Sequence, residues 1–348
     1  MIQDKIDIVP KYSVLLCMMV VMIHNSIPAY FTYSSEGIAY YIHMFLVNFL
    51  PLLYACAVPS FFIISGFLFF RNYQKKDYSR KIKSRIHTLF IPYLLWNVFG
   101  LLTEMLTKIP FFASLATVNS NPFDLENIVM GIFFHKYTVL WFVFMIMLFA
   151  ILAPIIFYIV RRKILFGFVF ISLLAFVLVY DKGFCSFFGI GLEYSSIIYY
   201  LIGSYLGIYH KDFFDYRINF NVYALMLFFV VTIILELGVK EYEYYSRIYF
   251  ILVKIILLYL IFTHFESEIK LRHWFGATFF IYAFHLPVMR FTTGMLRFLF
   301  DILNIDFALK ELLLYVVSFV IVMIVCIKIA SFLEIKTPRI YKLLTGNR

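Results

Sequence analysis

The residue best suited to chemistry in this sequence is His24, which lies in the first long apolar stretch, residues 12–31. About 20 residues, each rising about 1.5 Å along a helix, cross the ~30 Å hydrocarbon core of a bilayer. An imidazole is costly against lipid, so we expect it to face other helices or a water-filled cavity. Because histidine exchanges a proton near pH 7, His24 is either a proton-transfer residue or a structural histidine hydrogen-bonded between helices.

Further ionisable residues lie inside other apolar stretches. His285 is in the run 274–298, and Arg290 follows it five residues later. Glu236 and Lys254 lie in two more runs. Such groups are candidates for function when they lie within a membrane span. Glu236 and Lys254 are close enough to span ends that they can instead extend toward the interface.

Two other segments have spacings that suit contact with a ligand. Ser65-Gly66 stands in a Phe-rich run, where another helix or a ligand can approach the backbone closely. Lys81 and Arg85 are four residues apart and therefore share one face of a helix. Such a pair can hold the phosphates of a nucleotide-bearing substrate. It can also simply set the topology and contact anionic lipid headgroups.

The composition indicates an integral membrane protein. Of the 348 residues, 64% are hydrophobic and 14% are charged, whereas soluble proteins are about 45–50% apolar and about 25% charged. The net charge of +10 is explained by basic cytoplasmic loops, so no nucleic-acid partner is expected. The four cysteines show no metal-ligand spacing, and we expect neither disulfides nor a metal site.

The apolar runs predict an all-α fold, a polytopic transmembrane helix bundle of about ten spans that forms a single domain over residues 1–348. The predicted spans are residues 12–31, 45–70, 86–107, 138–160, 164–180, 192–209, 219–238, 248–264, 274–298 and 309–333.

The distribution of Lys and Arg predicts the orientation of these spans. Basic residues concentrate in alternate connections, with seven of them between the second and third spans. Basic loops stay in the cytoplasm, so both termini are predicted to be cytoplasmic, which agrees with an even number of spans. The stretch 108–137 is then an external loop. Within it, Asn119 to Pro122 predicts a turn that caps a helix from Phe123.

In their order along the chain, these motifs resemble the acyltransferase-3 family of integral membrane acyltransferases over most of the sequence. The resemblance rests on His24, Phe61 to Phe67, the basic stretch that leads into Pro92 to Trp96, Leu140-Trp141-Phe142, Tyr200 to Gly207, and Ile281 to Pro287.

One position departs from the family pattern. The family usually has an arginine eleven residues before the histidine, and this chain has Ser13 there. The nearest basic residue is Lys11, which does not lie on the same helix face as His24.

The resemblance implies transfer of an acyl group, often acetyl, from cytoplasmic acyl-coenzyme A (acyl-CoA) to a glycan or lipid-linked sugar at the outer face of the cell inner (plasma) membrane. It implies that His24 is the central catalytic residue and that Arg85 lies at the donor end, where we also place Lys81. The expected partners are acyl-CoA, the glycan acceptor and the lipid bilayer. No permanently bound cofactor is expected.

A histidine suits this reaction because a sugar hydroxyl is a weak nucleophile that needs a base. General bases contribute ~10²–10⁴-fold to such rates. Asn25, Ser65 or a freed backbone N–H are candidate donors to the developing oxyanion, and His285 and Trp141 are further candidates for support. Alternatively, His24 carries the acyl group covalently.

Two other functions stay open on the sequence alone. One is a transporter or flippase for a lipid-linked or polymeric glycan, with a path lined by His24, Glu236, Lys254 and His285. The other is an inactive relative that serves as a membrane partner in an envelope assembly.

Overall fold

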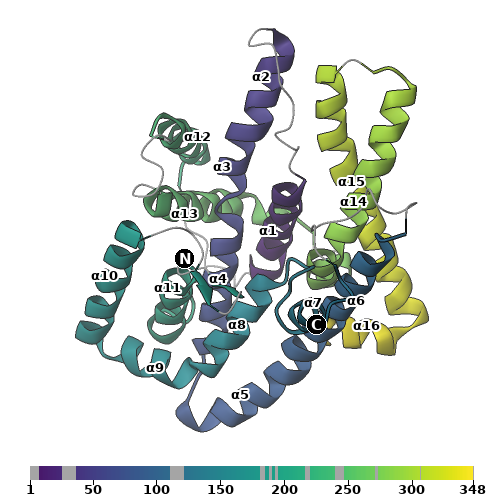
Figure 1. Ribbon diagram of the computed structural model, residues 1–348. Helices are drawn as coiled ribbons and strands as arrows, with labels where there is room; N and C mark the ends of the chain where they lie inside the picture. The colour runs from purple at the N-terminus through teal and green to yellow at the C-terminus, as the bar shows by residue number, and fades with distance from the viewer. Residues whose placement is uncertain are drawn as a thin grey trace. The chain divides into compact units, whose positions relative to one another are not determined.

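The computed structural model describes residues 8–25, 37–109, 121–180, 185–187, 190–192, 195–215, 220–239, 247–270, 273–305 and 307–347. These residues are almost entirely helical (Figure 1), which agrees with the predicted all-α class. One small antiparallel hairpin is the exception, in which β1 (Cys185–Phe187) pairs with β2 (Ile190–Leu192).

The chain divides into two compact units, each built from separate stretches of sequence. The first unit comprises Met1–Leu16, Ala55–Arg85 and Met145–Phe275. The second comprises Cys17–Tyr54, Ile86–Phe144 and Gly276–Arg348.

The first unit contains the start of α1 (Ile8–His24), the end of α8 (Trp141–Ile151) and a series of complete helices. These are α4 (Ala57–Phe70), η2 (Lys75–Asp77), α5 (Tyr78–Arg85), α9 (Ala153–Arg161), α10 (Lys163–Tyr180), α11 (Ser195–Tyr209), α12 (Val222–Gly238), α13 (Arg247–Phe265) and η6 (Glu266–Glu268). The short helix η7 (His273–Ala277) crosses from the first unit to the second.

Glycines allow α4 and α11 to pack backbone against backbone. A Cβ atom at Gly66 would lie 2.4 Å from the carbonyl oxygen of Tyr200, and one at Gly203 would lie 2.0 Å from that of Ile63. No real side chain fits at these distances, so each glycine is required for the close approach. Of the two predicted uses of Ser65-Gly66, the structure shows helix packing at Gly66.

Buried ion pairs connect other helices of the first unit. Lys254 Nζ donates to Glu236 Oε2 over 2.6 Å, which joins α13 to α12, and the Lys254 side chain is fully buried. These two residues therefore pair with each other instead of extending toward an interface. Lys11 on α1 donates in the same way to the carboxylate and the backbone oxygen of Glu266.

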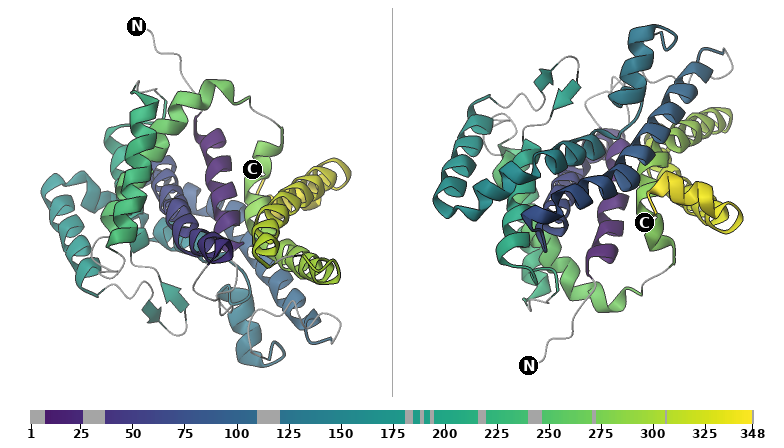
Figure 2. Two further views of the ribbon diagram at one scale, coloured as in Figure 1. Left: turned by 90° about the horizontal axis from the view of Figure 1, so that it is seen from above. Right: turned by 90° about the horizontal axis from the view of Figure 1, so that it is seen from below.

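The second unit contains the remaining helices and the other parts of α1 and α8. They are α2 (Ile38–Met44), the π-helical turn η1 (Phe45–Phe49), α3 (Leu50–Tyr54), the π-helical turn η3 (Ile86–Phe90), α6 (Ile91–Leu106), α7 (Leu125–Phe133), α14 (Thr278–Ile302), α15 (Phe307–Lys336) and α16 (Pro338–Thr345). The longest two, α14 and α15, lie side by side in every view (Figures 1 and 2).

The short helix α7 packs antiparallel against α6. The hydroxyl of Tyr93, early in α6, donates to the backbone oxygen of Phe133 at the end of α7 over 2.8 Å. Asn97 Nδ2 donates to the backbone oxygen of Ile132 over 3.1 Å. The short helix predicted within 108–137 is thus present as α7, and its end packs against the part of α6 that contains Tyr93 and Asn97. Polar side chains of α6 therefore bond the backbone of α7 directly.

Four helices are long and apolar enough to cross a membrane, among the described residues. They are Tyr40–Phe70, Lys75–Leu106, Ile248–Glu268 and Lys310–Lys336. A fifth span is possible if α8 and α9 count together, but the two are bent by 67°. The predicted span 138–160 is thus bent in the structure, because the helix breaks at Leu152 just before Pro154, which cannot continue it.

Candidate active site

The two histidines singled out in the sequence lie next to each other in the second unit. His24 is the last residue of α1, and His285 lies near the start of α14. Their ring centroids are 5.2 Å apart, with an angle of 39° between the ring planes. His285 is fully buried, whereas His24 is partly exposed. The pair therefore joins an accessible imidazole to an inaccessible one.

Hydrogen bonds to the backbone fix the proton of His285. Its Nδ1 lies 2.7 Å from the backbone oxygen of Tyr282 and 3.2 Å from that of Ile281. A carbonyl oxygen only accepts, so Nδ1 must carry the hydrogen. In the neutral ring, Nε2 is then the nitrogen with a free lone pair. Nε2 is buried and has no hydrogen-bond partner among the described residues.

Asn25 holds the end of α1 against α15. Its Nδ2 donates to the backbone oxygen of Tyr315 over 2.6 Å. Ser318 Oγ in turn donates to Asn25 Oδ1 over 2.7 Å, and both side chains are buried. Because Asn25 directly follows His24, these two bonds fix where the imidazole lies. The structure thus gives Asn25 a positioning contact, while the sequence suggested an oxyanion donor.

Two charged residues of the second unit contribute to the electrostatics of the site. The guanidinium of Arg290 interacts electrostatically with both imidazoles. Glu104 on α6 interacts electrostatically with Arg290, and Glu104 is only 1% exposed. Sequence reasoning missed Glu104, although an acidic residue inside the predicted span 86–107 was a usable signal. Arg290 was among the ionisable candidates within the apolar runs, but the sequence assigned it no specific role.

Aromatic side chains attach the neighbouring elements to α14. Tyr282 donates from its hydroxyl to the backbone oxygen of Val139 over 2.5 Å, two residues before α8 begins at Trp141. Trp141 itself is partly buried. Trp96 on α6 donates from Nε1 to the backbone oxygen of Leu344 over 3.0 Å, and its ring packs 5.3 Å from that of Phe280. The start of α14 is thereby held against three other segments of the unit.

Lys81 and Arg85 come together in the first unit on one aromatic ring. Lys81 Nζ lies 4.8 Å and Arg85 Cζ 5.5 Å from the ring centre of Phe69. Lys81 also donates to the backbone oxygen of Phe69. The predicted shared helix face is therefore confirmed. Ser65, on α4, is in the same unit and partly buried.

Lys11 has a partner of its own. It is bonded to Glu266 in the first unit, and Ser13 lies half a turn later on α1. Lys11 is therefore used in an ion pair with Glu266.

Comparison with known proteins identifies the family. A family model described as an acyltransferase domain, that of the acyltransferase-3 family, matches residues 14–331. No curated protein and no solved structure matches the chain. The matched region includes both histidines, the bonded Asn25, and the stacked pair Lys81 and Arg85. By this match, the chain belongs to the acyltransferase-3 family and is an acyltransferase.

Proposed function

We propose that this acyltransferase moves an acyl group, in the first place acetyl, from cytoplasmic acyl-CoA to a hydroxyl of an envelope or exported glycan. The observation that carries the proposal is the pairing of a partly exposed His24 with a buried His285 whose Nε2 is free. In the proposed arrangement the chain crosses the plasma membrane ten times and keeps both termini in the cytoplasm.

In the proposed reaction, His24 acts as the general base. It takes the proton of the acceptor hydroxyl while the oxygen attacks the thioester carbonyl. The carbon–sulfur bond then breaks, and the thiolate of coenzyme A leaves and is protonated by the imidazolium. An ester and a free thiol are the products, and His24 is regenerated neutral.

His285 suits the role of a positioning residue in this scheme. Its Nε2 can accept a hydrogen bond but cannot donate one, because Nδ1 carries the hydrogen of the neutral ring. An N–H of His24 directed at that lone pair would leave the other nitrogen of His24 as the base. Such bonds are often long in the free enzyme and tighten with substrate bound. A carboxylate plays the same orienting role in serine hydrolases.

Arg290 is the best candidate to stabilise the oxyanion of the tetrahedral intermediate. A cation fixed near the reacting carbonyl stabilises developing negative charge strongly in a site that excludes water. The charge of Arg290 interacts electrostatically with both imidazoles, and the charge of Glu104 interacts electrostatically with Arg290. Arg290 would then stabilise the oxyanion, a role that the sequence suggested for Asn25 or Ser65.

The test uses purified protein in liposomes supplied with acetyl-CoA and an extracted envelope glycan. Release of free thiol and acetylation of the glycan are measured together. His24→Ala should lower both rates by about 10²–10⁴-fold. The matched control is His87→Ala, an exposed histidine of the same unit, which should react at the wild-type rate.

Wild-type rates in His24→Ala would overturn the proposed role of His24. A protein that only moved the glycan across the membrane, or an inactive relative, would release no thiol and leave the glycan unmodified.

A further inference from the structure

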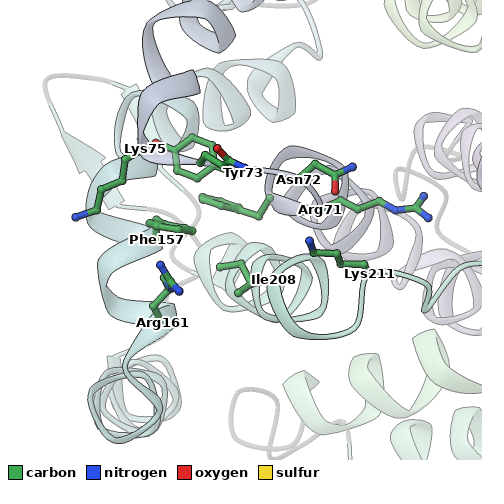
Figure 3. A pocket seen from close by; sticks show the side chains of 10 residues that line it. Arg71, Asn72, Tyr73, Lys75, Phe157, Arg161, Ile208 and Lys211 are labelled. Atoms are coloured by element: carbon green, nitrogen blue, oxygen red, sulfur yellow. The ribbon is translucent and has the colours of Figure 1, made fainter.

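A basic pocket of about 350 Å³ opens in the first unit (Figure 3). It lies where α4, α9 and α11 end. The lining residues are Phe70, Arg71, Asn72, Tyr73, Gln74, Lys75, Phe157, Arg161, Ile208 and Lys211. Four of them are basic and none is acidic, so the pocket is suited to an anion.

Three of these four cations are available to a ligand. Arg71 is paired with Asp215 and lies 3.6 Å from Asp212. Lys75, Arg161 and Lys211 form no ion pair with any residue that the structure describes. A ligand with several negative charges would neutralise them, since Lys and Arg bind phosphate oxygens well.

Helix dipoles alone do not account for this arrangement. Basic residues are stabilising near helix C-termini, and Arg161 is in the last turn of α9. That effect needs no cavity and no aromatic wall. Here the ring of Phe157 packs 4.9 Å from that of Tyr73, and Arg161 Cζ lies 5.3 Å from the Phe157 ring centre. The rings and the cations thus line one space (Figure 3).

The hydroxyl of Tyr73 also lacks a partner. It is buried and makes no hydrogen bond with the described residues. Burial raises the pKa of Tyr73 above its ordinary value, so the hydroxyl keeps its proton. Lys81 Nζ lies 5.6 Å from the centre of the Tyr73 ring. Tyr73 therefore connects the pocket to the pair Lys81 and Arg85.

We propose that this pocket binds a multiply phosphorylated nucleotide, with its phosphates at Lys75, Arg161 and Lys211 and its base against the aromatic wall. The inference rests on the proposed function, in which the nucleotide is the 3′-phosphorylated adenosine diphosphate end of the acyl donor. An anionic phospholipid headgroup shares the phosphate chemistry but has no base.

The experiment measures binding of adenosine 3′,5′-bisphosphate to the full-length protein in nanodiscs of neutral phosphatidylcholine. Arg161→Gln and Lys211→Gln should each weaken binding about tenfold, since each removes a charged hydrogen bond to phosphate. Arg162→Gln is the matched control, because Arg162 neighbours Arg161 but stacks on Tyr158 outside the pocket. It should bind as the wild type does. Unchanged thermal unfolding of all three variants would show that the losses arise at the site.

Three outcomes would overturn the proposal. They are wild-type binding by both Arg161→Gln and Lys211→Gln, equal binding of inorganic phosphate, and displacement of the nucleotide by phosphatidylglycerol added to the nanodiscs. The last would assign the pocket to a lipid headgroup. The binding result is independent of catalysis. Binding of the bisphosphate without any acyl transfer would contradict the proposed function but support the proposed pocket. Acyl transfer without binding of the bisphosphate at this pocket would contradict only the pocket proposal.

Discussion

At the scale of single residues, the histidine pair assigns different tasks to two chemically identical side chains. His285 has its Nδ1 hydrogen committed to the backbone of its own helix, whereas His24 is partly exposed at a helix end. Accessibility suits a group that meets substrate, and a fixed lone pair suits a group that orients it. The sequence placed both residues in apolar runs, and the resemblance alone made His24 the catalytic one; the pairing and the burial of the His285 ring were not predictable, because they depend on how α1 and α14 pack.

The substitution His285→Asn tests the orienting role. An asparagine amide can still donate to the backbone oxygen of Tyr282, as Nδ1 does, but it offers nothing at the place of Nε2. We expect kcat for acyl transfer to fall about 10²-fold, with KM for the acyl donor unchanged. The melting temperature in detergent should stay close to that of the wild type. A wild-type kcat in His285→Asn would show that His285 does not orient His24 for catalysis.

Arg85 offers a second test at this scale, directed at the donor. Arg85→Gln should raise KM for acyl-CoA about tenfold, because it removes a charged contact to phosphate, and leave kcat unchanged. Lys83→Gln is the matched control, since Lys83 is exposed on the same short helix. Steady-state rates at varied donor concentration separate the two parameters. An unchanged KM in Arg85→Gln would remove this residue from donor binding.

At the scale of helices, the positions of most elements follow from apolar periodicity, but their contacts do not. The predicted spans 164–180 and 248–264 agree closely with α10 (Lys163–Tyr180) and α13 (Arg247–Phe265). The packing of α7 against α6 was missed, since the polar residues around it favour an external loop. It depends on Asn97 and Tyr93 bonding a distant backbone, which no local pattern reports. The bonds of Asn25 to α15 escaped prediction for the same reason.

The contact between α4 and α11 gives a prediction about stability. In Gly203→Ala the new Cβ would lie 2.0 Å from the backbone oxygen of Ile63, so the helices must separate. Overpacking of this kind costs about 1–3 kcal/mol, and we expect a clearly lower melting temperature in detergent. The control is Gly167→Ala on α10, where nothing lies within 4 Å. That change should be neutral or stabilising, since alanine favours helix over glycine. Equal melting temperatures for the two variants would contradict the close packing.

At the scale of the whole molecule, composition predicts a membrane protein, but it does not determine the number of spans, which depends on the length and polarity of each helix. The described part of the chain has four helices that meet the length and polarity of a span, or five with the bent pair. Other predicted spans correspond to helices that are shorter or more charged, such as α1 with 17 residues and α14 with Arg290 within it. A helix of 17 residues is about 26 Å long, so it reaches across a bilayer only with the flanking chain or local thinning.

Labelling with a membrane-impermeant maleimide tests the proposed topology. Single cysteines are introduced at Lys76, Leu125 and Asn347, in a background that carries Cys185→Ser. The native Cys17, Cys56 and Cys326 are buried and should stay unreactive. If the basic connections and both termini are cytoplasmic, intact cells should label only Leu125→Cys, which replaces a residue 78% exposed at the start of α7. Lys76→Cys and Asn347→Cys should label only after the membrane is opened.

Each result excludes a different arrangement of the chain. Labelling of Asn347→Cys in intact cells, with Lys76→Cys protected, would require an odd number of spans after α5, whereas ten spans require an even number. It would also place the basic residues of α16 outside, against the bias of the remaining loops. Protection of Leu125→Cys in intact cells, with labelling after the membrane is opened, would place the start of α7 on the cytoplasmic side. In that case the chain between α6 and α7 would have to lie inside, and the acceptor could not approach the histidine pair from the outer face along this loop.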